Sequence, residues 1–377
     1  MKPLTNTRFT PLRQDTALIA VFALSVIAMP QSVMAACTSS GTGTYLCENA
    51  NSIGITITGT DIDINTAPGF SVSEPGNSDA ALNIMGSGTV KYTDVNGSTL
   101  DTQGGYSLQI NNTTTAGESS LTHVQTNANI PNGLFIENSS QNDSTVAIDL
   151  SGSLSEGGYD NFAIDVRTKR EKNASVNINT QGISGDNGIN TVVHSANGTA
   201  RQDINLQGDL NVSGVGGYIN NASSNGSGIL NFSAKNLIAL SDVIYISNSG
   251  HDGAAITHID IDGDITSTNG QAASFYNNSY NGLSDLTIRA NNVSGQYLGL
   301  NITNYSQYGS SQTDIALTGD ISATSGHALR LSTYASEGDV GSTIKLNNVS
   351  SFYDGLYISA NATQGDVTSN LDVSGTI

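Results

Sequence analysis

Tryptophan is absent from this 377-residue sequence, and Lys and Arg number 13 against 32 Asp and Glu, a formal net charge of −19 at pH 7. Contact with phosphates requires dense Lys and Arg, so the composition argues against nucleic acid as a partner. Charged residues make up 12% of the chain and cysteine occurs twice. We therefore expect stacked polar side chains, rather than ion pairs, on a long exposed surface.

A short apolar pattern recurs along the chain from about Ile148. Two apolar residues flank one spacer, and the first members of the pairs recur every 26–29 residues. The pairs are Ile148/Leu150, Val176/Ile178, Ile204/Leu206, Leu230/Phe232, Ile259/Ile261, Leu286/Ile288, Ile315/Leu317, Ile344/Leu346 and Leu371/Val373. Eight of the nine spacers are polar, which indicates a strand with one inward and one outward face.

Each repeat continues with two further strand-like segments. A turn with Gly or Asn follows the pair and leads to another aliphatic residue, such as Leu210, Ile265 or Ile321. A third apolar segment follows, as at Phe162–Ile164, and its corner is expected to absorb differences in repeat length. A fixed period of this size predicts a right-handed parallel β-helix, an all-β solenoid with three short strands per coil of about 28 residues.

The same pattern extends upstream less regularly. Ile55/Ile57 and Leu82/Ile84 predict further coils. The stretch from Val90 to Leu100 does not fit the period, and we expect it to be an inserted loop. The β-helix is therefore assigned to residues 53–377.

The first 35 residues have the pattern of a secretory signal peptide. Lys2, Arg8 and Arg13 precede an apolar run over 17–29, and small residues follow at 33–35. The run is too short to span a bilayer comfortably. We expect cleavage before Ala36 or Cys37 and export across the inner membrane.

Both cysteines lie close to this expected mature N-terminus. In an oxidising compartment Cys37 and Cys47 are expected to form a disulfide within a cap over residues 36–52. Such a cap would cover the exposed edge of the first coil. The alternative is a lipoprotein acylated at Cys37, but the preceding residues match the usual lipobox poorly.

Signal peptide, cysteine pair and an acidic, otherwise Cys-free β-solenoid together resemble the passenger region of a Gram-negative autotransporter. Corner motifs at Leu206–Leu210, Ile261–Ile265 and Leu317–Ile321 resemble those of pertactin-like and diffuse-adhesion-like passengers. The resemblance implies display at the outer-membrane surface or release. The partners it implies are host surface or matrix glycans and proteins, or like passengers on neighbouring cells.

Such passengers are normally followed by an outer-membrane translocator barrel. No segment of this sequence resembles one, and the chain stops at Ile377 without a polar terminal cap. We expect a truncated product. A complete secreted solenoid, with its last coil capped by a partner, is the alternative.

Catalytic motifs of the family are missing, and no cofactor is expected. Ser184–Gly188 resembles a protease Gly-Asp-Ser-Gly motif only superficially and is expected to form a corner. The five histidines are expected in loops or at strand starts, without metal-ligand spacing. No metal site is assigned, although Asp260, Asp262 and Asp264 are weak candidates for calcium because Asp260 and Asp262 should both point outward.

Tyrosines provide the clearest ligand-contact candidates. Ten of the 14 tyrosines lie from Tyr218 onward. Those in or near the corner that follows the third apolar segment are Tyr276, Tyr280, Tyr305, Tyr308 and Tyr334. They are expected either to stack on sugars or protein partners, or simply to cover apolar surface beside the third strand.

The basic loop at 167–172 adds Lys169 and Arg170 as candidate contacts, with a plain solvated loop as the alternative. The sequence thus favours a non-enzymatic adhesion or self-association passenger. One alternative is an extracellular polysaccharide lyase or hydrolase that uses Asp260, Asp262 and a nearby Arg. Another is a non-functional fragment of a larger autotransporter.

Overall fold

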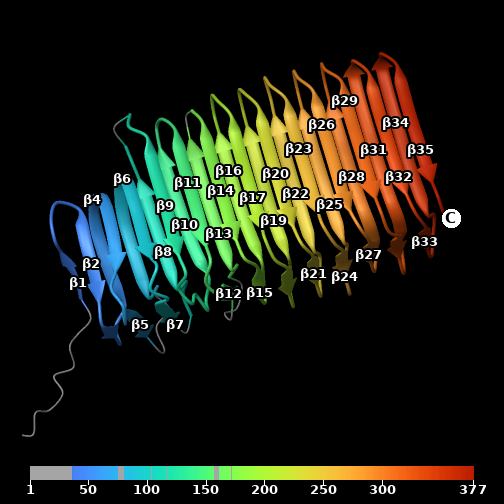
Figure 1. The fold of residues 1–377 in the computed structure, drawn as a ribbon. Coiled ribbons are helices and arrows are strands. Elements are labelled where there is room, and N and C mark those ends of the chain that lie inside the picture. Colours follow the sequence, from blue (N-terminus) through green and yellow to red (C-terminus); the bar gives the residue numbers. More distant parts are fainter. Residues whose placement is uncertain (1–35, 75–79, 103, 116, 157–160, 171) are drawn as a thin grey trace, which may run out of the picture. The chain divides into compact units, whose positions relative to one another are not determined.

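The computed structural model describes residues 36–377 except 75–79, 103, 116, 157–160 and 171. All regular secondary structure among these residues is β-strand. The strands stack in parallel from coil to coil along the whole described chain (Figure 1). This confirms the predicted β-solenoid with three strands per coil. No described helix is long and apolar enough to cross a membrane.

Three faces make up each coil. Successive first-face strands pair in parallel with one another, as β22 pairs with β19 and β25. These strands are β8 (Leu108–Thr113), β10 (Leu134–Ser140), β13 (Ile164–Arg170), β16 (Ile189–Ser195), β19 (Gly217–Ser223), β22 (Ile244–Gly250), β25 (Ala273–Ser279), β28 (Leu298–Ser306), β31 (His327–Glu337) and β34 (Leu356–Gln364).

The second face follows the first after a tight corner. Its strands are β9 (Ser120–Thr126), β11 (Ser144–Leu150), β14 (Ala174–Thr180), β17 (Ala200–Leu206), β20 (Gly228–Ala234), β23 (Ala255–Ile261), β26 (Ser284–Ala290), β29 (Ser311–Leu317), β32 (Val340–Leu346) and β35 (Val367–Val373). Long strands β4 (Ile55–Thr66) and β6 (Leu82–Asp94) run across both faces, so the two faces belong to one 24-stranded sheet.

Short strands form the third face. Three of them, β3 (Ala50–Asn51), β5 (Ser71–Glu74) and β7 (Thr99–Thr102), form one sheet. The other eight are β12 (Ser155–Glu156), β15 (Ile183–Gly185), β18 (Leu210–Val212), β21 (Leu237–Ala239), β24 (Ile265–Ser267), β27 (Val293–Gly295), β30 (Ile321–Ala323) and β33 (Val349–Ser351). Aliphatic residues at their starts stack in register from Ile183 to Val349, as predicted.

The predicted apolar pairs all lie on the second face, but three of them are shifted. Ile148 is in register with Ile178 rather than with Val176. In the same way Phe232 and Ile288, not Leu230 and Leu286, continue the column. A shift of two residues keeps the same side chains inside, so the first eight pairs are buried as predicted although the alignment was wrong, whereas Leu371 in the last pair is exposed.

The stretch from Val90 to Leu100 is not an inserted loop. Val90 and Tyr92 are fully buried in the second half of β6, and Leu100 is buried on β7. The prediction was wrong because β4 and β6 turn the first corner within a continuous strand, which removes the usual spacing. Gly86 allows this close packing, since a Cβ there would lie 2.3 Å from a Val90 methyl.

The N-terminal end carries the expected disulfide. β1 (Ala36–Ser39) pairs antiparallel with β2 (Thr44–Glu48), and Cys37 lies opposite Cys47. β2 then pairs in parallel with the second half of β4. The hairpin thus lies next to the first coil, where the disulfide joins its two strands.

Asparagines inside the first face form a ladder that the sequence reading missed. Asn221, Asn248, Asn277 and Asn304 are buried and in register near the first corner. Each Nδ2 donates to the Oδ1 of the next, at 2.9, 3.2 and 3.1 Å. The same amides also donate to backbone carbonyls, as Asn221 does to those of Ala200 and Ile229. The buried Nδ2 groups of these four asparagines are therefore all paired, as buried polar groups normally are, whereas Oδ1 of Asn221 has no partner.

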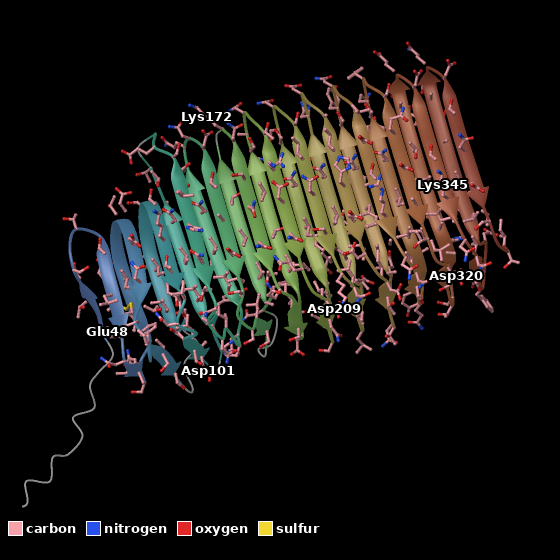
Figure 2. All side chains as sticks on the ribbon, in the orientation of Figure 1. Glu48, Asp101, Lys172, Asp209, Asp320 and Lys345 are labelled. Carbon is pink, nitrogen blue, oxygen red and sulfur yellow. A yellow bond between two sulfur atoms is a disulfide. The ribbon has the colours of Figure 1, made fainter. Side chains whose placement is uncertain are left out.

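A second ladder follows the corner between the second and third faces, where Figure 2 labels Asp209 and Asp320. Asp and Asn alternate along it. Each Asn Nδ2 donates to the Asp Oδ1 of the preceding coil, and the Oδ1 of Asn236 or Asn292 accepts the backbone N–H of the Asp in the next coil. The members are Asp209, Asn236, Asp264, Asn292, Asp320 and Asn348. The length of the coils alternates as well. Along the column of inward second-face residues from Phe232 to Leu371, successive members are 27, 29, 27, 29 and 27 residues apart. From β20 onward the structural repeat is therefore two coils.

Differences in coil length do not arise at the corner where they were expected. The third apolar segment of each predicted repeat is a first-face strand in the structure, so the corner that was expected to vary is the one between the first and second faces. The corner between the first and second faces has four residues in each coil from β16 to β29. The next corner alternates instead, with three residues between β23 and β24 and two between β26 and β27. The inner asparagines fix the first corner, so insertions occur elsewhere.

Candidate binding face

Exposed tyrosines gather on the outer side of the first face. Tyr218 on β19 and Tyr245 on β22 occupy the same position in neighbouring coils. Their ring centroids lie 6.2 Å apart at an angle of 54°, and Phe162 packs edge-on against Tyr218 at 6.1 Å. Their side chains point outward because the alternate residues Ile219, Ile244 and Ile246 fill the core.

Tyr276 continues this group in the next coil, two positions further along its strand. Ser247 lies opposite Tyr276 in the ladder, so the three rings descend like steps across the face. Between them lies a hollow of about 350 Å³. We call it the tyrosine hollow; the residues that matter here are Tyr218, Tyr245, Tyr276, Asp242, Gln271 and Asn301.

The other predicted tyrosines form two separate pairs nearer the first corner. Tyr305 and Tyr334 stack in parallel at 5.3 Å. Tyr280 and Tyr308 meet edge to face at 5.0 Å, and His251 stacks on Tyr280 at 4.5 Å. Four of the five predicted rings therefore pair with each other, whereas Tyr276 joins Tyr218 and Tyr245, which the sequence analysis did not select.

Hydrogen bonds set the ionisation of two of these phenols. The bond with Tyr308 raises the pKa of Tyr280 above its ordinary value of 10.0. Bonds with Ser336 and Thr363 lower the pKa of Tyr334. The Tyr280 ring therefore remains a neutral hydrogen-bonding surface at physiological pH.

The basic segment lines a different part of the first face. Lys169 on β13 borders a hollow of about 470 Å³ with Glu137, Val192 and His194. Arg167 also lines this hollow, and its guanidinium makes bidentate bonds to the buried Asp165 carboxylate, at 3.1 and 2.8 Å. This carboxylate raises the pKa of Arg167. Arg170 ends β13, but its side chain lies outside the described part of the structure.

The acidic trio is spread over a strand and a corner. Asp260 and Asp262 are both exposed, as their outward positions predict. Asp264 belongs to the corner ladder, where its Oδ1 accepts hydrogen bonds from Asn291 and Asn292. Over the described residues, no group of three or more His, Cys, Asp or Glu side chains is placed to hold a metal ion.

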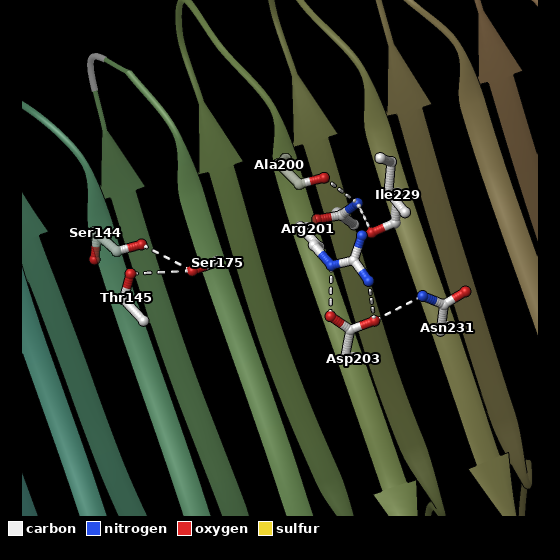
Figure 3. A network of polar contacts seen from close by, with 9 residues as sticks. Ser144, Thr145, Ser175, Ala200, Arg201, Asp203, Ile229 and Asn231 are labelled. Atoms are coloured by element: carbon white, nitrogen blue, oxygen red, sulfur yellow. Dashed lines mark hydrogen bonds and ion pairs between the residues drawn. The ribbon is translucent and has the colours of Figure 1, made fainter.

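Asp260 lines a hollow of about 420 Å³ on the second face, together with His258 and Asp203. Arg289 lies beside Asp260 in the next coil. Asp203 is occupied by other partners, since it accepts two bonds from Arg201 and one from Asn231 at 2.6 Å (Figure 3). Of the two carboxylates that line the hollow, Asp260 is therefore the one that is not bonded to Arg201 and Asn231, and its ladder neighbour Arg289 is not among the lining residues.

The Ser184–Gly188 motif and the histidines remain to be placed in the coils. Ser184 lies on β15, and the Asp186 carboxylate after it accepts a bond from Ser213 in the next coil. His123, His194 and His258 lie within strands rather than in loops. The expectation is met by His251, in the corner after β22, and by His327, at the start of β31. It was wrong for the other three because these strands alternate inward apolar with outward polar residues, and histidine suits an outward position.

Comparison with models of protein families, with curated proteins and with solved structures finds no match for this chain. The fold and the surface chemistry are therefore the basis for assigning a role.

Proposed function

We propose that this protein is an exported, non-enzymatic β-solenoid that acts in adhesion or self-association at a Gram-negative cell surface, as autotransporter passengers do. The observation that carries the proposal is the row of exposed tyrosines on the first face. Tyr218, Tyr245 and Tyr276 are 42%, 42% and 41% exposed, and exposed aromatic clusters are typical of binding surfaces.

Other features support this role. The signal-like N-terminus and the Cys37–Cys47 disulfide suit an oxidising extracytoplasmic location. Few described side chains form ion pairs, and the second face carries ladders of amides and carboxylates, such as Asn179 to Asp149 at 3.2 Å. A long polar surface with one aromatic row suits many weak contacts rather than a single deep pocket.

The experiment measures binding and self-association of the exported chain. The full chain is expressed with its own leader, recovered from the periplasm, and tested for binding to epithelial cells, to extracellular matrix and to itself by analytical ultracentrifugation. We expect binding in at least one assay that falls when Tyr245 and Tyr276 are replaced by Ala. Absence of all three activities contradicts the proposal.

A second candidate function rests on the hollow that contains Asp260. Its carboxylate beside the Arg289 position resembles the acid and base pairing that an extracellular polysaccharide lyase would need. This function predicts calcium-dependent release of unsaturated products from polygalacturonate or alginate, followed by absorbance at 235 nm. Asp260→Asn should abolish that release, and no release from either polymer would eliminate this candidate.

A further inference from the structure

We propose that the tyrosine hollow binds a neutral oligosaccharide. This inference deepens the proposed surface role and rests on it only for its biological context. The hollow itself is defined by three tyrosines, one carboxylate and two carboxamides that come from four successive coils.

The tyrosine rings provide platforms for sugar rings. Each is about two-fifths exposed, and no described segment covers them. The face of an aromatic ring carries partial negative charge, which attracts the C–H groups on the flat face of a pyranose. Successive coils are spaced about 4.8 Å apart, so three ring-bearing coils span roughly 10 Å, about the length of two sugar units.

Polar groups beside the rings are available for sugar hydroxyls. Asp242 uses Oδ1 to accept the backbone N–H of Gln271 at 2.8 Å. Gln271 uses Oε1 to accept the hydroxyl of Ser274, also at 2.8 Å. Among the described residues, Asp242 Oδ2 and the Gln271 amide N–H groups are left to bond a ligand as acceptor and donor.

Charge and shape favour a neutral sugar over other ligands. The lining contains one carboxylate and no Lys or Arg, so an acidic sugar or a nucleic acid would meet repulsion without a counter-charge. A peptide added as a strand would need a free sheet edge, but β19, β22 and β25 are paired on both sides. The volume of about 350 Å³ is within the range of small-molecule sites.

The test is isothermal titration of the full exported chain with neutral and anionic oligosaccharides. The neutral probes are malto-, cello-, manno- and galacto-oligosaccharides of three to six units, and the anionic probes are trigalacturonate and sialyllactose. We expect a neutral probe to bind with a dissociation constant of about 0.1–5 mM. Tyr245→Ala and Tyr276→Ala should each weaken binding about three- to tenfold, and Gln271→Ala should weaken it as well.

Tyr297→Ala is the matched control, because Tyr297 is 54% exposed and is not among the residues that line the hollow. It should bind as the wild type does. The inference is overturned if no neutral probe binds up to about 10 mM, if Tyr245→Ala and Tyr276→Ala bind like the control, or if the anionic probes bind better.

The outcomes separate this site from the adhesion role. Neutral-sugar binding that requires Tyr245 and Tyr276, without cell binding or self-association, supports the site and contradicts the proposed function. Cell binding or self-association that falls with these two substitutions, with no sugar binding, supports the proposed function and overturns the site.

Discussion

At the residue scale, buried asparagines and corner carboxylates hold neighbouring coils in register. Asn248 connects three coils, because its Oδ1 accepts from Asn221 and its Nδ2 donates to Asn277. Asp264 accepts three bonds through a single oxygen. Both residues therefore act on their neighbours rather than on a ligand.

Replacing Asn248 by Ala should destabilise the protein by about 2 kcal/mol, since it removes buried hydrogen bonds to the amides of Asn221 and Asn277 and to the carbonyls of Gly228 and Ile256. The midpoint of urea unfolding measures the change. Asn269→Ala, at an exposed corner position, is the control and should leave the midpoint unchanged. Equal effects of the two substitutions would contradict a structural role for the inner ladder.

Asp264 and Asp262 offer a matched pair within one corner. Asp264→Ala removes the acceptor for Asn291 and Asn292 and should cost about 2–3 kcal/mol of unfolding free energy. Asp262→Ala removes an exposed carboxylate and should change stability by less than about 0.5 kcal/mol. Thermal unfolding of both variants, with and without calcium, checks this. A calcium-dependent loss in both would indicate a metal site instead.

The stability of the folded state should depend on pH through Asp285. Burial raises its pKa above the ordinary 3.8, with Asp314 also raising it and His258 lowering it. The folded state therefore holds this proton more tightly than the unfolded state, and stability falls as the carboxyl ionises above pH 3.8.

Asp285→Asn should consequently raise the free energy of unfolding at pH 7 by roughly a few tenths of a kcal/mol, because the group is half exposed. The melting temperature should therefore rise at pH 7 and stay unchanged near pH 3. Asp262→Asn serves as the control at both pH values. A lower melting temperature for Asp285→Asn at pH 7 would mean that its charge is stabilising.

At the element scale, the sequence predicted the strands well and their partners less well. Alternation around Ile148, Ile204 or Ile259 reports which side chains face inward, but it is unchanged by a shift of two residues. The pattern of apolar residues also did not predict the buried asparagines of the first face, since Asn was expected to face solvent or to lie in a turn. The repeated apolar-x-Asn-x-Ser pattern, at Phe275–Ser279 and Ile302–Ser306, was the available signal.

The candidate site was less predictable than the fold. Composition identified tyrosine as the residue type, and Tyr276 proved to be in the hollow. Tyr218 and Tyr245 were missed because they become neighbours of Tyr276 only when β19, β22 and β25 pair. Residues in register on these strands, such as the inner asparagines, are 27 and 29 positions apart in the sequence. Ring pairing of Tyr305 with Tyr334 likewise follows from register, not from local sequence.

At the scale of the whole molecule, stability should vary along the stack, because each coil contacts only its neighbours. Replacing Cys37 and Cys47 by Ser should reduce amide hydrogen-exchange protection in β2 and β4, by about 2–3 kcal/mol for this short loop. Protection in β28, many coils away, should not change. Equal loss of protection in β28 would show that the stack unfolds as one unit.

Cell binding of three forms of the protein tests the central claim, that the outer side of the first face makes the functional contacts. The forms are the wild type, a Tyr218/Tyr245/Tyr276→Ala variant, and an Asp260→Asn, Arg289→Ala variant. The account predicts that the tyrosine variant loses at least tenfold in binding, while the second-face variant binds like the wild type. Loss of binding only in the second-face variant would contradict it.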